Sequence, residues 1–295
     1  MTNIEQRLTN ELQNQNGVFS PKKRKELLKI FVRRIAFIGD THVASQFALM
    51  PESFTNDKGN VILASPGQKM MLNYFNQYKD KIDELECDTL VHLGDMIHGQ
   101  NHKELGKDLV TSNLNEQKNM AYELHKPLCV GRKALFVGGS GYHQGAGKNQ
   151  SPEQDVCERL GGEWFGAVAN VKFAPSEKLW HIQHGESAAM VYQATVLERD
   201  GNFMKIAEAN GDLPHIDCFA KGHWHTWAHL HLDQFHAIQV PCWAAWQPTK
   251  FGKLYYGKQP KIGGVICLID EQGRVTVWPF LYKPIPRIAD MITMQ

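Results

Sequence analysis

The sequence has only six cysteines in 295 residues, and they are widely spaced. They lie at positions 87, 129, 157, 218, 242 and 267, so no C-x-x-C motif occurs. This spacing excludes the redox pair of a thioredoxin-type enzyme and the cysteine cluster of a zinc knuckle. Scattered cysteines are typical of a reducing compartment, and a cytoplasmic location is therefore predicted.

Neither an excess of one charge nor a long apolar run is present. Lysine and arginine total 32 against 31 acidic residues, which gives a net charge of +1. A nearly neutral chain has no general attraction for nucleic acid or an anionic membrane, so contact with a polyanion requires a local patch. No run of ~18 apolar residues occurs, and the N-terminus lacks an apolar signal core. We expect a soluble protein without a membrane partner, and nothing in the sequence indicates its oligomeric state.

Residues 1–30 are predicted to form an N-terminal helical, basic appendage, and residues 31–295 one domain. The first seventeen residues are polar and show little apolar periodicity. Ser20-Pro21 is typical of a helix start, with proline at the first helical position. The run Lys22-Lys23-Arg24-Lys25 then makes this helix basic. A solvated helix face is the preferred interpretation of such a run, and a nucleic-acid contact is the alternative.

Strand and helix patterns alternate from residue 31 to about residue 225. Apolar runs predict strands at 31–38, 89–93, 134–137, 171–173 and 179–183, and from 216 toward 223. The clearest helix starts at Ser65-Pro66, because apolar residues then recur every 3.6 positions. Further helices are expected at 103–128, from a capping box at Ser151, and at 188–199 and 203–209, while 43–65 is expected to be loop. Only strands follow, at 228–232, 235–240, 262–269 and 275–280, which favours two stacked sheets with helices outside.

Polar side chains follow five of these strands. The five segments are Asp40-Thr41-His42, Gly94-Asp95, Gly139 to His143, His184-Gly185 and Gly222-His223-Trp224-His225. The carboxyl edge of an open α/β sheet binds ligands, so residues distant in sequence can meet there. Carboxylate and imidazole suit divalent Mn, Fe, Zn, Co or Ni, and the lack of a nearby cysteine argues against a thiolate zinc site. Each segment alone is weak evidence, because Gly-Asp and His-Gly pairs are common in turns. Together the five predict one metal site, with Asp95 as the natural bridging carboxylate.

In this order, the five segments resemble the motifs of the calcineurin-like metallophosphoesterase family, over about residues 32 to 282. The loop at 139–143 and the chain length are most similar to phage-type members. The resemblance implies a four-layer α/β/β/α sandwich of two mixed β-sheets flanked by helices. It also implies two divalent transition metal ions, such as manganese, and attack on the phosphate ester by a metal-bridging hydroxide. The ligands that the resemblance implies for the first metal are Asp40, His42 and His225, and those for the second metal are His184 and His223. Asp95 would bridge the two metals and take part in catalysis. His143 would face the substrate.

The sequence departs from the family at its Gly-Asn-His motif, whose asparagine binds the second metal. The loop is two residues longer here, so Ser140 or Tyr142 stands where the asparagine is expected, depending on the alignment. Either side chain is a candidate replacement ligand. His98 and Asn101, and also His102, follow Gly94-Asp95 and are candidates for contacts just outside the metal ligands, although a plain polar loop is at least as good an interpretation.

The resemblance implies a phosphoesterase, and a phosphodiester is the favoured substrate. Protein phosphatases of the family carry an arginine in Asp-Arg-Gly, whereas Asp95 is followed here by Met96-Ile97-His98-Gly99. The substrate would be nucleic acid or nucleotide-like, and exposed tryptophans at 224, 227, 243 and 246 would suit base stacking, although core packing is the commoner fate of tryptophan. The alternatives are a phosphomonoesterase or protein phosphatase, a binding or scaffold protein on a degenerate metallophosphoesterase fold, and a purely structural metal site.

Overall fold

The computed structural model describes residues 21–100, 106–144, 151–185, 193–232, 235–245 and 259–285. Its helices are α2 (Pro21–Ile30), α3 (Pro66–Glu84), α4 (Leu114–Cys129), α5 (Gly141–Gln144), α6 (Pro152–Arg159) and α7 (Gln193–Ala209). Its strands are β1 (Phe31–Ile38), β2 (Ser53–Thr55), β3 (Val61–Leu63), β4 (Thr89–His92), β5 (Lys133–Phe136), β6 (Glu163–Trp164), β7 (Val168–Lys172), β8 (Leu179–Gln183), β9 (Cys218–Lys221), β10 (Ala228–Leu232), β11 (Phe235–Gln239), β12 (Ile262–Asp270) and β13 (Val275–Tyr282).

The first sheet has six strands in the order β13-β12-β1-β4-β5-β6. Strands β1, β4, β5 and β6 are parallel, while β12 and β13 are antiparallel additions. Successive residues of β1 point to opposite faces, as the two-residue period of a strand requires. Ala36 and Ile38 pack with residues of α3, α4 and α6, and Ile35 and Phe37 pack toward the second sheet. A sheet buried on both faces explains why successive residues are apolar from Ile35 to Ile38 in β1 and at Leu90 and Val91 in β4.

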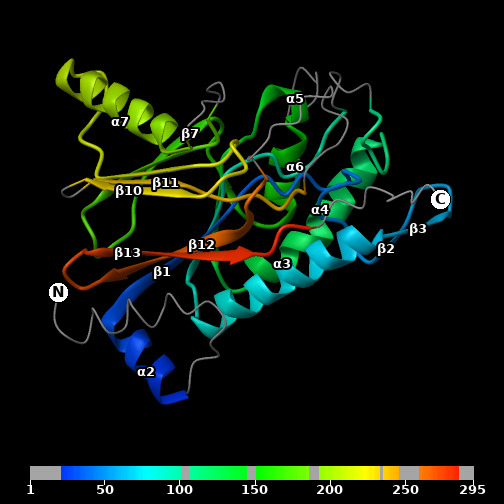
Figure 1. The fold of residues 1–295 in the computed structure, drawn as a ribbon, viewed down its shortest axis with the longest axis horizontal. Helices are drawn as coiled ribbons and strands as arrows, with labels where there is room; N and C mark the ends of the chain where they lie inside the picture. The colour runs from blue at the N-terminus through cyan, green and yellow to red at the C-terminus, as the bar shows by residue number, and fades with distance from the viewer. Residues whose placement is uncertain are drawn as a thin grey trace, which may run out of the picture.

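The second sheet has five strands in the order β10-β11-β9-β8-β7. Helix α7 covers its outer face, where Leu197 and Met204 pack against Phe219 and Ala237. Trp180, Ile182 and Ile238 lie in the core between the two sheets. Figure 1 shows α7 above β10 and β11, with β12 and β13 on their other side. The four-layer α/β/β/α arrangement of two mixed sheets that the sequence indicated is therefore the fold.

Most helix starts follow from local sequence. Ser65 caps α3, and a capping box with Gln68 is complete. At α6 the expected capping box is only half formed, because the Ser151 hydroxyl accepts from the Glu153 amide while Gln154 bonds Glu158 instead. Ser151 is still the cap, so the start of α6 was predicted correctly.

Three predicted elements were wrong in part. The segment 43–65, expected to be loop, contains the β2–β3 hairpin. The helix expected from residue 103 begins only at Leu114, because Asn113 is its cap and accepts from two backbone amides. The break expected between 199 and 203 is absent: α7 continues through Gly201, which packs close to the Phe235 ring. Tertiary packing there outweighs the low helix propensity of glycine.

Helix α2 is attached to the body of the protein through Leu27, which is 2% exposed and lies in the core cluster of α3. Arg24 also forms an ion pair with Glu86. The remainder of the predicted appendage, residues 1–20, lies outside the described residues. Among the helices of the described ranges, none has the length and apolar character needed to cross a membrane.

Candidate metal centre

The five polar segments meet where strands β1, β4, β5, β8 and β9 end. The segments after β1 and β4 run side by side, with backbone bonds of 2.9 Å from Asp40 N to Gly94 O and from His42 N to Asp95 O. His184 follows β8 of the second sheet, and its Nδ1 lies 2.7 Å from Leu93 O of the first. The carboxyl edges of both sheets therefore contribute to one site, as the topology of parallel strands allows.

The backbone at this site is unusual, because five non-glycine residues have positive φ. The values are 51° at Asp40, 40° at His42, 50° at Asp95, 77° at His223 and 52° at His225. Side chains disfavour this left-handed region, so such residues persist only where the surrounding structure holds them, typically at functional sites. All five are residues that the sequence indicated as metal ligands.

Two glycines allow the carboxylates to come close to neighbouring backbone. A Cβ at Gly139 would lie 2.1 Å from Asp95 Oδ1, and a Cβ at Gly222 would lie 2.6 Å from Asp40 Oδ2. Any side chain at either position would displace a carboxylate oxygen. The close packing of Asp95 therefore requires a glycine at position 139, and that of Asp40 requires a glycine at position 222.

The first group of candidate ligands is Asp40, His42 and His225. His225 Nε2 lies 3.0 Å from His42 Nε2 and 3.3 Å from Asp40 Oδ1. Both Asp40 oxygens accept from the His223 amide, at 3.1 and 2.9 Å, which fixes the carboxylate. Burial lowers the pKa of His42 well below its ordinary value, so this ring is neutral and has a lone pair for a cation.

The second group is Asp95, His184 and His223. His184 Nε2 lies 3.0 Å from Asp95 Oδ2 and 3.1 Å from His223 Nδ1. Because the Leu93 carbonyl can only accept, His184 Nδ1 carries the proton, and its Nε2 faces the group. A histidine that donates one ring N–H to a carbonyl and presents the other nitrogen is the usual arrangement at a metal.

Asp95 lies between the two groups and His143. Its Oδ2 is 3.0 Å from His184, 4.0 Å from His42 and 3.9 Å from His143 Nε2. Burial raises the pKa of Asp95, but the His184 and His143 rings outweigh burial and hold that pKa well below its usual range. Burial lowers the pKa of His184, but Asp95 and Asp40 outweigh it and raise that pKa to about 9. A proton on His184 therefore balances the charge of Asp95, the role that a cation would take.

The donor set fits divalent transition metal ions. Two carboxylates and four imidazoles converge from buried or half-buried positions, and both groups offer lone pairs at short range. No cysteine is near these segments in the sequence, but the fold brings Cys242, from the loop after β11, beside the His225 side chain. Its position 17 residues further along the chain concealed this contact. Burial lowers the pKa of His225, but Cys242 and Asp40 outweigh burial and raise it well above its ordinary value.

Ser140 and Tyr142, the two candidates for the missing asparagine, take different positions. Ser140 is buried, and its amide donates to Asp95 Oδ1 at 2.7 Å, while its hydroxyl lies 3.2 Å from both Asp95 oxygens. The Tyr142 side chain is half exposed on α5. The structure thus brings Ser140, and not the exposed Tyr142 ring, against the central carboxylate.

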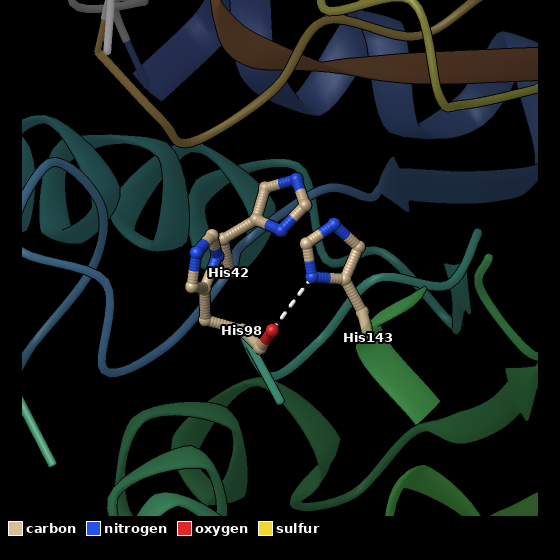
Figure 2. A group of neighbouring side chains, drawn as sticks. All are labelled: His42, His98 and His143. Atoms are coloured by element: carbon tan, nitrogen blue, oxygen red, sulfur yellow. Dashed lines mark hydrogen bonds between the residues drawn. The ribbon is translucent and has the colours of Figure 1, made fainter. Parts of the chain in front are cut away.

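His143 and His98 lie beside His42, and the three imidazoles group together (Figure 2). His143 Nδ1 bonds the His98 carbonyl at 2.6 Å, and His98 Nε2 bonds Asp108 Oδ2 at 2.7 Å. His98 is therefore in contact with the site, as the sequence suggested, whereas Asn101 and His102 lie outside the described residues.

Sequence reasoning missed four residues near the site: Asp108, Gln117, Glu153 and Cys242. The Glu153 carboxylate accepts from the Gly139 amide at 2.8 Å, and burial together with Asp95 raises its pKa to about 7. In the sequence, Glu153 follows a helix cap, which conceals its contact with the loop after β5. No motif marks Asp108 or Gln117, because their contacts with His98 and Gly99 form only in the folded chain.

Comparisons with known proteins bear on the fold. No protein-family model and no curated protein matches the sequence. A solved archaeal phosphodiesterase is 12% identical with a TM-score of 0.43, covering 83% of this chain and 99% of its own. Vps29 from Entamoeba histolytica, complexed with zinc, is 11% identical with a TM-score of 0.40, covering 84% and 98%. A predicted phosphoesterase from Streptococcus pneumoniae is 10% identical with a TM-score of 0.35, covering 84% and 97%.

Proposed function

We propose that the protein is a dinuclear metal-dependent phosphoesterase that hydrolyses a phosphodiester. The observation that carries the proposal is the pair of ligand groups joined through Asp95 Oδ2, which lies 3.0 Å from His184 and 4.0 Å from His42. Asp40, His42 and His225 would hold one ion, and His184 and His223 the other, with Asp95 between them. When bound, two divalent ions supply Lewis-acid polarisation of a phosphoryl group and a nucleophilic water at neutral pH.

His143 is the proposed proton carrier of the reaction. Its Nε2 lies 3.9 Å from Asp95 Oδ2, next to the ligand groups without belonging to either. Its Nδ1 is held by the His98 carbonyl, so Nε2 is the nitrogen that faces the substrate. With its own proton on Nδ1, this imidazole takes a second proton at Nε2 from water in the site, and the imidazolium then gives that proton to the departing ester oxygen or stabilises the charge that develops there.

A diester fits the side chains at the site better than a monoester. A phosphomonoester dianion is commonly gripped by an arginine, and the site residues named above are carboxylates, imidazoles and a serine. A nucleic-acid strand or a nucleotide-like diester is the proposed substrate class. Of the candidate stacking residues in the described ranges, Trp243 is fully buried and Trp227 packs against the core between the sheets, whereas Trp224 is half-buried beside the site and is the one that a base could reach. Trp246 lies outside the described residues.

The first prediction concerns two substitutions. Metal-loaded wild type should hydrolyse bis(4-nitrophenyl) phosphate faster than 4-nitrophenyl phosphate. Asp95→Asn should abolish turnover because the shared ligand loses its charge, and His143→Ala should lower kcat by about 10²–10⁴-fold because the proton carrier is removed. Release of 4-nitrophenolate measures both effects.

The matched controls are Asp88→Asn and His125→Leu. Asp88 lies just before β4, the strand whose other end leads to Asp95, and His125 is buried on α4. Both controls should retain wild-type turnover per folded molecule. If metal-loaded wild type hydrolyses no diester, monoester, single-stranded or double-stranded DNA, the protein is not a phosphoesterase, and a scaffold on this fold is the better account.

A further inference from the structure

The peptide between His98 and Gly99 connects His143 to a buried side chain on helix α4. Its carbonyl, from His98, accepts the His143 Nδ1–H at 2.6 Å (Figure 2). Its amide, from Gly99, donates to Gln117 Oε1 at 2.8 Å. The two groups belong to one planar peptide unit, so fixing the amide fixes the carbonyl. Gln117 therefore determines where the acceptor for His143 lies.

The Gln117 amide is itself held in one orientation. Its Nε2 donates to Gly99 O at 2.9 Å and to Thr111 O at 2.8 Å, while its Oε1 accepts from Gly99. The side chain is fully buried. Because both partners of Nε2 are carbonyls, the oxygen and nitrogen of this amide cannot exchange places. Hydrogen bonds in such a chain also polarise one another, which strengthens the His98 carbonyl as an acceptor.

A second buried contact holds the His98 ring. Its Nε2 lies 2.7 Å from Asp108 Oδ2, and both side chains are at most 1% exposed. The His98 and His143 rings lie 4.9 Å apart between centroids, tilted by 45°. Asp108 thus restrains the ring of His98, and Gln117 restrains the carbonyl of His98. The His98 carbonyl that accepts from His143 and the His98 ring beside His143 are thus both held by buried contacts.

We propose that Gln117 is a positioning residue, which acts through the 98–99 peptide to hold His143 as the Nδ1–H tautomer with Nε2 toward Asp95. The carbonyl of His98 can only accept, so His143 Nδ1 carries the proton and Nε2 has the lone pair. The catalytic consequence rests on the proposed function, whereas the tautomer does not. Asp108 assists from the other side of His98.

The direct test is nitrogen NMR of metal-free protein labelled with ¹⁵N-histidine, with the His143 signals assigned from the spectrum of His143→Ala. Wild type at neutral pH should show a protonated Nδ1 and an unprotonated Nε2. Gln117→Met, which keeps the volume but removes the amide, should shift both signals toward the average of the two tautomers. His125→Leu, on the same helix, should leave them unchanged. If Gln117→Met does not fold, Gln117→Leu, which also removes the acceptor for the Gly99 amide, replaces it with the same expected shift.

A kinetic readout tests the catalytic part. If His143 serves the leaving oxygen, Gln117→Met should lower kcat at least tenfold for a diester with an alkyl leaving group, and much less for one with a 4-nitrophenolate leaving group, with KM unchanged. A merely structural defect would lower both rates equally. An inactive wild type with the Nδ1–H signature would refute the proposed function alone.

Two outcomes would overturn the inference itself. The first is an unchanged His143 signature in Gln117→Met. The second is a third bound ion in wild type that His98→Gln removes, because His42, His98 and His143 lie close enough to share a cation. An ion there would occupy His143 Nε2 and exclude its proposed role.

Discussion

Five residues of the candidate metal centre have a backbone conformation that side chains disfavour. Asp40, His42, Asp95, His223 and His225 all have φ between 40° and 77°. Each such residue costs of order 1–3 kcal/mol, so the surrounding hydrogen bonds must hold it. The bonds from His42 N to Asp95 O and from His223 N to Asp40 do this. Each of these turns with candidate metal ligands is therefore supported by a neighbouring turn that also carries candidate ligands.

The second prediction concerns Gly139. Gly139→Ala should strongly weaken metal binding, because a Cβ would lie 2.1 Å from Asp95 Oδ1 and 2.2 Å from Asp95 N. Gly141→Ala is the matched control two residues away, where a Cβ meets nothing within 4 Å. Isothermal titration with Mn²⁺ or Zn²⁺ measures the difference. Equal metal affinity in the two variants would show that the Asp95 carboxylate is not a ligand.

At the scale of elements, the β10–β11 hairpin carries a stack of three histidines at the end of the second sheet away from the metal centre. His231 and His236 are cross-strand partners with ring centroids 4.1 Å apart, and His229 lies 5.3 Å from His236. Burial lowers the pKa of His229 to about 4, and the neighbouring His231 ring adds to this effect. Burial lowers the pKa of His236 to about 3, with further contributions from His231 and Lys178. Both rings are neutral in the folded protein near neutral pH.

The third prediction is a loss of stability in acid that depends on this stack. A histidine whose folded pKa lies below its unfolded value of 6.5 contributes full stability above pH 6.5 and loses it as the pH falls toward the folded pKa. When the pH is lowered from 7.5 to 5, the Tm of both proteins should therefore fall, and the fall for His236→Gln should be about 2–4 °C smaller than that for wild type. His215→Gln, at an exposed histidine, is the control. Equal falls in all three proteins would contradict the role of the stack.

Helix α7 is fixed to the second sheet by an ion pair at the edge of the site. Lys221, at the end of β9, is fully buried and pairs with Asp200 of α7, whose side chain is 14% exposed. The next residues along the chain are Gly222 and His223, so the pair also anchors the start of a metal-site loop.

The fourth prediction is that Asp200→Asn destabilises the protein by about 3–5 kcal/mol, because it removes the carboxylate that neutralises a buried ammonium group. Urea unfolding at pH 7 measures this. Glu177→Gln is the control, since Glu177 pairs with Lys172 at the surface, with 88% and 53% of the side chains exposed. Similar effects of the two substitutions would show that burial of Lys221 is not significant for stability.

At the scale of the whole molecule, the site joins the two halves of the sandwich. Asp40, His42 and Asp95 follow strands of the first sheet, while His184, His223 and His225 follow strands of the second. Each ligand group takes residues from both sheets. A bound ion would therefore link the two sheets, and the position of each ligand depends on how the sheets stack.

This dependence explains what the sequence could predict. Strand patterns and the polar residues after them indicated the two-sheet fold and residues that now lie together, because both follow from local periodicity and from parallel strands sharing an edge. Gln117 and Cys242 could not be predicted, since each reaches the site from an element whose packing is set by tertiary contacts. The continuous α7 was also missed, because the contact of Gly201 with Phe235 is not visible in local sequence.

Stepwise metal reconstitution measures whether two ions act together at this site. Metal-free protein is titrated with Mn²⁺, and the bound equivalents per chain are measured alongside hydrolysis of bis(4-nitrophenyl) phosphate. We expect two bound equivalents and turnover that appears only as the second one binds. Full activity at one equivalent, or two bound equivalents with no hydrolysis of any phosphoester tested, would contradict it.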